Sequence, residues 1–136
     1  MTVPELLHSA KTVAVVGLSD KPDRPSYSVA KRLQTKGFTI IPVNPRLKEW
    51  EGLKSYPYVS SIPEDISIDI IDVFRISDAT PDVVRDVLKR KSGPRAIWLQ
   101  SGIINAESRK LAEDAGIFYI EDDCLGVEAR ILPNVA

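Results

Sequence analysis

Cysteine and histidine are almost absent from this sequence of 136 residues, which contains one of each, Cys124 and His8. A single cysteine excludes an internal disulfide framework. The two residues together supply too few soft ligands for a structural zinc site. His8 falls in a predicted N-terminal helix, far from the predicted ligand-binding face, so the sequence does not predict a Ser–His catalytic triad.

Excess charge and long apolar runs are also missing. The 18 basic and 19 acidic residues leave a formal net charge of −1, so there is no global basic field to attract nucleic acid or an anionic membrane. No stretch approaches the ~20 apolar residues of a membrane-spanning helix. The first residues, Met1 to Glu5, lack the basic and apolar regions of a secretory signal. We therefore expect a soluble, cytoplasmic protein that binds neither nucleic acid nor membrane.

Helical and strand patterns alternate along the chain. Three segments share one order, in which an amphipathic helical pattern is followed by a glycine and a short apolar strand. Thr80 is the expected N-cap of the second helix, and Tyr58-Val59 is a candidate short edge strand. We predict helices over 2–10, 27–36, 80–93 and 105–115, and strands over 12–16, 38–43, 68–74, 96–99 and 117–120.

This alternation predicts the fold class. Strands and helices joined by short turns are typical of a Rossmann-like, doubly wound α/β domain with a mainly parallel sheet and helices on both faces. We expect residues 1–136 to form one such domain, with the first strand central. In these sheets a ligand binds beyond the carboxyl ends of the strands, where the strand order reverses. The candidate segments are therefore those that follow strands, namely 17–28, 44–48, 75–80, 100–105 and 121–127.

The first of these segments has the composition of an anion-binding loop. Gly17 follows the first strand, and the loop then leads into a helix whose N-terminal N–H groups attract anions. Ser19 and Ser26 offer hydroxyl groups, and Lys21 and Arg24 offer positive charge. The dinucleotide-binding pattern G-x-G-x-x-G is absent, since only its first glycine is present. An ordinary strand-to-helix turn is the alternative interpretation.

The end of the second strand is cationic where NAD-binding sheets usually carry an acid. Asn44 is followed by Arg46 and Lys48, which suit a phosphate on the ligand's ribose. Either NADP or the 3′-phosphate of coenzyme A (CoA) would satisfy this pattern, and two solvated surface cations are the alternative. Phe74, at the end of a later strand, is placed to contact an adenine or a pantetheine arm, unless it is a core aromatic.

Four motifs in order resemble a known family. Gly17-Leu18-Ser19, Pro42-Val43-Asn44-Pro45, Leu99-Gln100-Ser101-Gly102 and Asp123-Cys124-Leu125 look like the motifs of stand-alone CoA-binding domain proteins, which are similar to the N-terminal domain of the succinyl-CoA synthetase alpha subunit. The resemblance implies a CoA phosphate site at the first loop, an adenosine site after the second strand and a pantetheine site at the later strand ends. The candidate CoA contacts are Gly17, Leu18, Ser19, Arg24, Ser26, Tyr27, Asn44, Pro45, Arg46, Phe74, Arg75, Ser101, Gly102 and Cys124.

The leading hypothesis is therefore a protein that binds CoA or an acyl-CoA without catalysis of its own. The synthetase's active histidine lies in a following domain with no counterpart in these residues, so its ligase chemistry is not expected here. A small NADP-dependent oxidoreductase and a protein-interaction module on the same scaffold are the alternatives.

Cys124 and the tryptophans lead to further expectations. Cys124 is either a small core residue or a thiol that faces the CoA thiol and forms a mixed disulfide with it. Trp50 is expected near the adenosine end, where its fluorescence would respond to ligand, whereas Trp98 should lie inside a strand. Exposed apolar residues near Trp50 and Tyr58 would support a homodimer.

Overall fold

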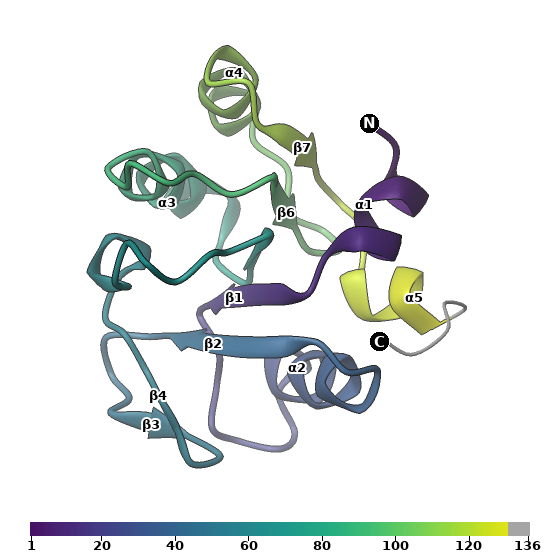
Figure 1. Cartoon of the computed structure of the whole chain (residues 1–136), viewed down its shortest axis with the longest axis vertical. Helices are drawn as coiled ribbons and strands as arrows, with labels where there is room; N and C mark the ends of the chain where they lie inside the picture. The colour runs from purple at the N-terminus through teal and green to yellow at the C-terminus, as the bar shows by residue number, and fades with distance from the viewer. Residues whose placement is uncertain (131–136) are drawn as a thin grey trace.

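Five parallel strands form the central sheet of the computed structural model, which describes residues 1–130 (Figure 1). Their order is β2-β1-β5-β6-β7, so β5 is the middle strand. The expectation of a central first strand is therefore corrected, although β1 is interior and has neighbours on both sides. The chain passes from β1 to β2 on one side and then returns to β5 on the other, which makes the end of β1 the point where strand order reverses. The strands are β1 (Thr12–Val16), β2 (Thr39–Val43), β5 (Ile70–Val73), β6 (Ala96–Leu99) and β7 (Phe118–Ile120).

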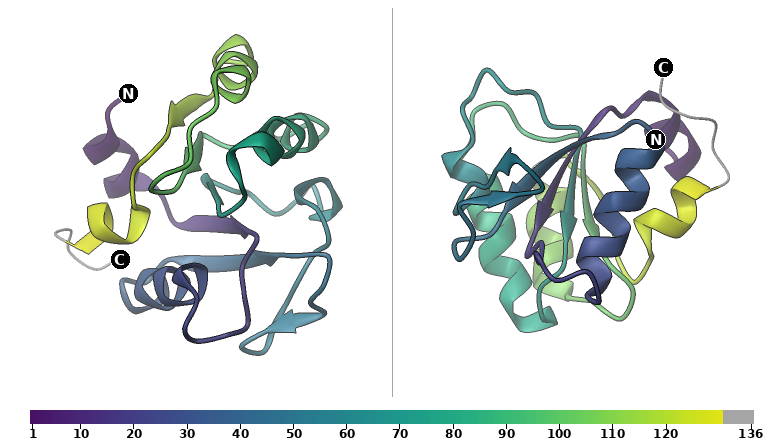
Figure 2. Two further views of the ribbon diagram at one scale, coloured as in Figure 1. Left: turned by 180° about the vertical axis from the view of Figure 1, so that it is seen from behind. Right: turned by 90° about the horizontal axis from the view of Figure 1, so that it is seen from below.

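Helices cover both faces of the sheet, as predicted (Figure 2, right). One face packs against α1 (Val3–Ser9), α2 (Pro25–Thr35) and α5 (Leu125–Arg130). The other face packs against α3 (Thr80–Val87) and α4 (Ala106–Asp114). Strands β1, β5 and β6 are almost wholly buried because each side of the sheet is covered, which explains why they are apolar except at Thr12 and Asp72.

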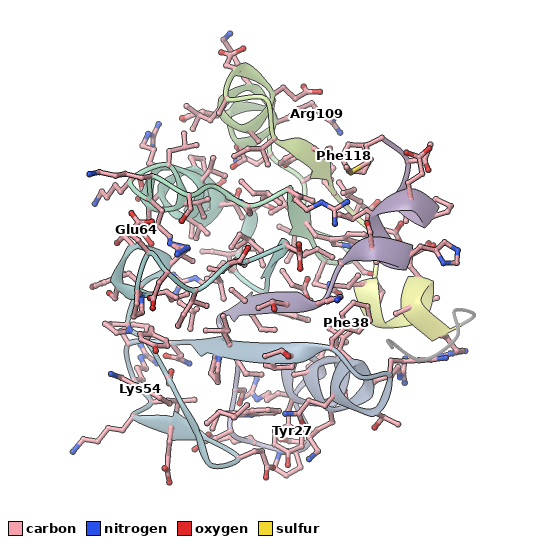
Figure 3. The ribbon with its side chains drawn as sticks, viewed as in Figure 1. Tyr27, Phe38, Lys54, Glu64, Arg109 and Phe118 are labelled. Carbon is pink, nitrogen blue, oxygen red and sulfur yellow. The ribbon has the colours of Figure 1, made fainter. Side chains whose placement is uncertain are left out.

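Several element boundaries differ from the sequence-based prediction. Thr80 is the first residue of α3 rather than its N-cap, because the 3-10 turn η2 (Ser77–Ala79) runs directly into the helix. The helix ends at Val87 instead of Gly93, and beyond it the backbone N–H groups of Lys91 and Ser92 donate to the carboxylate of Glu64, which is labelled in Figure 3. Helix α4 starts next to Asn105, as expected, and the side chain of this N-cap residue accepts a bond from the backbone N–H of Ser108 at 2.8 Å.

The segment between β2 and β5 also departs from expectation. Tyr58-Val59 is not a strand, because Val59–Ser61 form a 3-10 turn, η1. A small hairpin precedes it, formed by β3 (Glu49–Trp50) and β4 (Leu53–Lys54). Neither this hairpin nor α5 is predicted from the sequence. Within residues 1–130, no helix is both long and apolar enough to cross a membrane.

Candidate functional site

Two adjoining cavities open at the carboxyl edge of the sheet, of about 830 and 530 Å³. Both occupy the position that the strand order predicts for a ligand, around the ends of β1, β2 and β5. Five residues line both cavities and so form the ridge between them, namely Gly17, Asn44, Arg46, Phe74 and Arg75. All five are predicted site residues, so the structure brings together the segments that follow these three strands.

Gly17 lets two strand ends approach each other closely. Its φ is +83°, and a Cβ atom at this position would lie 2.3 Å from the carbonyl oxygen of Phe74. The Gly17 N–H donates to Val43 O on β2, and Phe74 N–H donates to Val16 O on β1, each at 2.9 Å. A side chain at Gly17 would therefore push apart the chain segments that form the ridge.

Serine hydroxyls hold the loop between β1 and α2 in place. The backbone N–H of Ser19 donates to Ser26 Oγ at 2.9 Å, and that of Lys21 donates to Ser19 Oγ at 3.1 Å. Both serines line the larger cavity, as predicted, yet Ser26 is buried and its hydroxyl is engaged within the protein. The two hydroxyls thus first shape the loop.

Two further side chains connect the loop to the end of β2. Asn44 Nδ2 donates to Leu18 O at 2.9 Å, while its Oδ1 accepts the backbone N–H of Arg46 at 2.9 Å. The Trp50 indole N–H donates to Ser19 O at 3.0 Å. Trp50 is only 1% exposed, whereas Leu53 and Tyr58 are exposed, and the homodimer stays a prediction. The bond from the Trp50 indole N–H to Ser19 O helps to fix the loop between β1 and α2.

Positive charge concentrates in the larger cavity. Four cations, Lys21, Arg24, Arg46 and Arg75, and a single acid, Asp20, line it, although the whole chain carries a net charge of −1. Within residues 1–130, none of these four cations takes part in an ion pair. Unpaired cations gathered around one cavity favour an anionic ligand.

The start of α2 adds to this attraction. The N-cap residue of this 11-residue helix is Arg24, whose side chain makes no capping bond, and the first turn contains no acid. The residues at this helix end line the larger cavity. An uncapped N-terminus presents the positive end of the helix dipole, so the arrangement suits a phosphate group.

The remaining walls are less polar. At the end of the larger cavity away from α2, Ile76 and Ile103 line it beside Ser77 and Gly102. The smaller cavity lies between the η1 segment and α3. Its walls there are Pro57, Tyr58, Val59, Asp82, Val83 and Asp86. Of these residues only Gly102 is a predicted CoA contact, although the candidate segments 75–80 and 100–105 also contain Ile76, Ser77 and Ile103.

Four predicted contacts line neither cavity, namely Leu18, Tyr27, Ser101 and Cys124. The side chain of Leu18 is fully buried. Tyr27 projects toward the β3–β4 hairpin, where its hydroxyl donates to Glu51 (Figure 3), and this bond raises the pKa of the phenol. Cys124 precedes α5 and packs, half-buried, against the core on that face. A role for these four residues in binding stays a prediction, as does the mixed disulfide.

A buried acid lies just below the site. Asp72 is fully buried on β5, two residues before Phe74. Its Oδ1 accepts from Gln100 Nε2 on the neighbouring chain segment, and its Oδ2 has no partner within the described residues. Burial without a compensating cation raises the pKa of this carboxyl to about 8. Asp72 is therefore protonated at neutral pH.

The fold and the site together define a Rossmann-like domain with a cationic cavity at the carboxyl edge of its sheet. Comparison with protein families identifies it further. The model of a CoA binding domain matches residues 11–130, and the chain belongs to this family. The resemblance seen in the four sequence motifs is thereby confirmed.

Relatives include small proteins and large ligases. The chain is 41% identical over 126 residues to the uncharacterized protein YneT of Bacillus subtilis, covering 92% of this chain and 90% of YneT. It is also similar to a solved structure from Thermus thermophilus, with 37% identity, a TM-score of 0.85 and coverage of 93% and 92%. An ADP-forming acetate–CoA ligase of Archaeoglobus fulgidus is 31% identical over 90% of this chain. This match spans only 19% of the ligase.

Proposed function

We propose that this protein binds coenzyme A or an acyl-CoA across the carboxyl edge of its sheet, without catalysis of its own. One observation carries the proposal, which is the group of four unpaired cations beside the uncapped start of α2 in a chain without net positive charge. Coenzyme A has a pyrophosphate and a 3′-phosphate, and both need such partners. Membership of the CoA binding domain family supports the same ligand.

The two cavities suggest how the ligand lies. The pyrophosphate would occupy the loop from Gly17 to Ser26, where Lys21, Arg24 and the positive end of the α2 dipole attract it. The adenosine end would lie near Asn44, Pro45 and Arg46, with the smaller cavity available to the base. The pantetheine arm would then run past the ends of β5 and β6, toward Phe74 and Gly102.

A charge reversal at Arg46 tests this arrangement. If Arg46 binds the 3′-phosphate, Arg46→Glu loses a charge-assisted bond worth about 1.5–3 kcal/mol, or roughly 10- to 150-fold in affinity for CoA. Dephospho-CoA lacks that phosphate, so its affinity should fall much less. Isothermal titration calorimetry measures both dissociation constants.

Lys48→Glu is the matched control. Lys48 is an exposed cation two residues further on that lines neither cavity, so its reversal should leave the preference for CoA intact. Equal losses of CoA and dephospho-CoA in Arg46→Glu would place the 3′-phosphate elsewhere. Failure of the unmodified protein to bind CoA would overturn the proposed function itself.

A further inference from the structure

We infer that the ligand of this site carries an apolar acyl group on its pantetheine thiol, and that three isoleucines bind this group. The inference rests on the proposed function and specifies its ligand class as an acyl-CoA with an uncharged hydrocarbon chain. The three residues are Ile76, Ile103 and Ile104, and we call them the isoleucine rim.

The rim comprises two exposed isoleucines and one that is half-buried against the core. The residue exposures are 75% for Ile76 and 56% for Ile104, while Ile103 is half-buried and lines the larger cavity together with Ile76. A single exposed apolar side chain needs no explanation. Here, however, Ile76 and Ile103 line the same cavity from two different loops, and the exposed Ile104 directly follows Ile103.

Hydrogen bonds hold the two loops of the rim together. Ser77 Oγ accepts the backbone N–H of Ile104 at 3.3 Å, and Ser77 O accepts Asn105 Nδ2 at 3.1 Å. On the other side, Gly102 N–H donates to Asp122 Oδ1 at 2.7 Å, and Asp122 N–H donates to Ile103 O at 3.1 Å. The rim is thus already positioned before a ligand arrives, which lowers the entropic cost of binding.

The larger cavity separates charge from apolar surface in the way an acyl-CoA does. Lys21 and Arg24 lie at the start of α2, whereas the rim borders the ends of β5 and β6. With the phosphates at the first position, the pantetheine thiol points toward the second. Free CoA would leave the rim exposed to water, while a hydrocarbon chain on the thiol would cover it.

Calorimetric titration with a series of CoA thioesters tests the inference. We expect affinity to rise from CoA through butyryl-CoA to hexanoyl-CoA, by at most about fourfold for each methylene that becomes fully buried. Hexanoyl-CoA should bind at least about tenfold more tightly than CoA. Succinyl-CoA, whose chain ends in a carboxylate, should show no such gain.

Variants locate the effect at the rim. The double variant Ile76→Asn, Ile104→Asn changes two exposed side chains, so it should fold normally, but it should bind hexanoyl-CoA no more tightly than CoA. Leu88→Asn is the matched control and should keep the preference for hexanoyl-CoA. Leu88 is an exposed apolar residue at the C-terminal end of α3, and it lines neither cavity.

Each outcome decides between the two proposals. Equal affinity for CoA and hexanoyl-CoA, a preference for succinyl-CoA, or an unchanged preference in the double variant would overturn the acyl inference and leave CoA binding standing. Absence of binding by all thioesters and by CoA would overturn the proposed function instead.

Discussion

Asp72→Asn should remove the contribution of Asp72 to the pH dependence of this protein's stability. Asp72 is the only fully buried carboxyl group among residues 1–130, and it has a pKa of about 8 instead of the ordinary 3.8. Between these two values the unfolded chain has released the proton while the folded protein retains it. The contribution of Asp72 to stability is therefore full below about pH 4 and is lost as the pH rises to about 8.

The size of the effect follows from the pKa difference. The free energy of unfolding should fall by up to about 1.4 kcal/mol for each pH unit in this window, or about 2–3 kcal/mol from pH 5 to pH 7. Asparagine has nearly the same shape, and its carbonyl oxygen still accepts from Gln100 Nε2. Because asparagine does not titrate, the variant should gain stability over the unmodified protein steadily as the pH rises.

Urea unfolding at pH 5, 6, 7 and 8, followed by circular dichroism, measures this difference. Asp65→Asn, at an exposed position, controls for the chemical change itself. A constant difference between Asp72→Asn and the unmodified protein from pH 5 to pH 8 would refute the reasoning, because it would mean that folding does not raise the pKa of Asp72.

Two further predictions concern the loop between β1 and α2. Gly17→Ala should destabilise the protein by about 2 kcal/mol or more and abolish CoA binding, since its Cβ would meet a backbone carbonyl at 2.3 Å and its φ is +83°. Thermal unfolding measures the loss of stability, and calorimetry measures the loss of CoA binding. A near-normal melting temperature and affinity would contradict the tight approach. Trp50 should change its fluorescence when CoA binds, because its indole N–H bonds to Ser19 O in that loop. The signal should survive in Trp98→Phe and disappear in Trp50→Phe, and the reverse pattern would be evidence against a loop response.

Sequence reasoning succeeded where a pattern has a local physical cause. Thr12–Val16 and Ala96–Leu99 are confirmed as strands because both of their faces are buried, which requires an uninterrupted apolar run. The residues of the ridge between the cavities could also be predicted from the sequence, because the carboxyl ends of parallel strands meet at the same edge of the sheet. Gly17 and Asn44 are recognisable as residues that directly follow such strands.

Features that depend on contacts between residues far apart in the sequence could not be predicted from it. The hairpin around Trp50 has strands of only two residues. The indole N–H of this buried tryptophan donates to a loop that lies 31 positions away in sequence. Glu64 precedes α3 in the sequence and accepts hydrogen bonds from the backbone of Lys91 and Ser92, which follow the helix. The sequence likewise does not reveal that Ser26 Oγ accepts a hydrogen bond from the Ser19 N–H, because this bond depends on the folded loop.

Binding of coenzyme A by the unmodified protein tests the central claim most directly. The protein should first be examined as purified by native mass spectrometry, and then titrated calorimetrically with CoA, dephospho-CoA, NADP and NAD. The account predicts co-purified CoA or an acyl-CoA, or micromolar binding that prefers CoA over dephospho-CoA and over both nicotinamide nucleotides. Binding of NADP alone would favour the oxidoreductase, and absence of binding by all four would contradict the account.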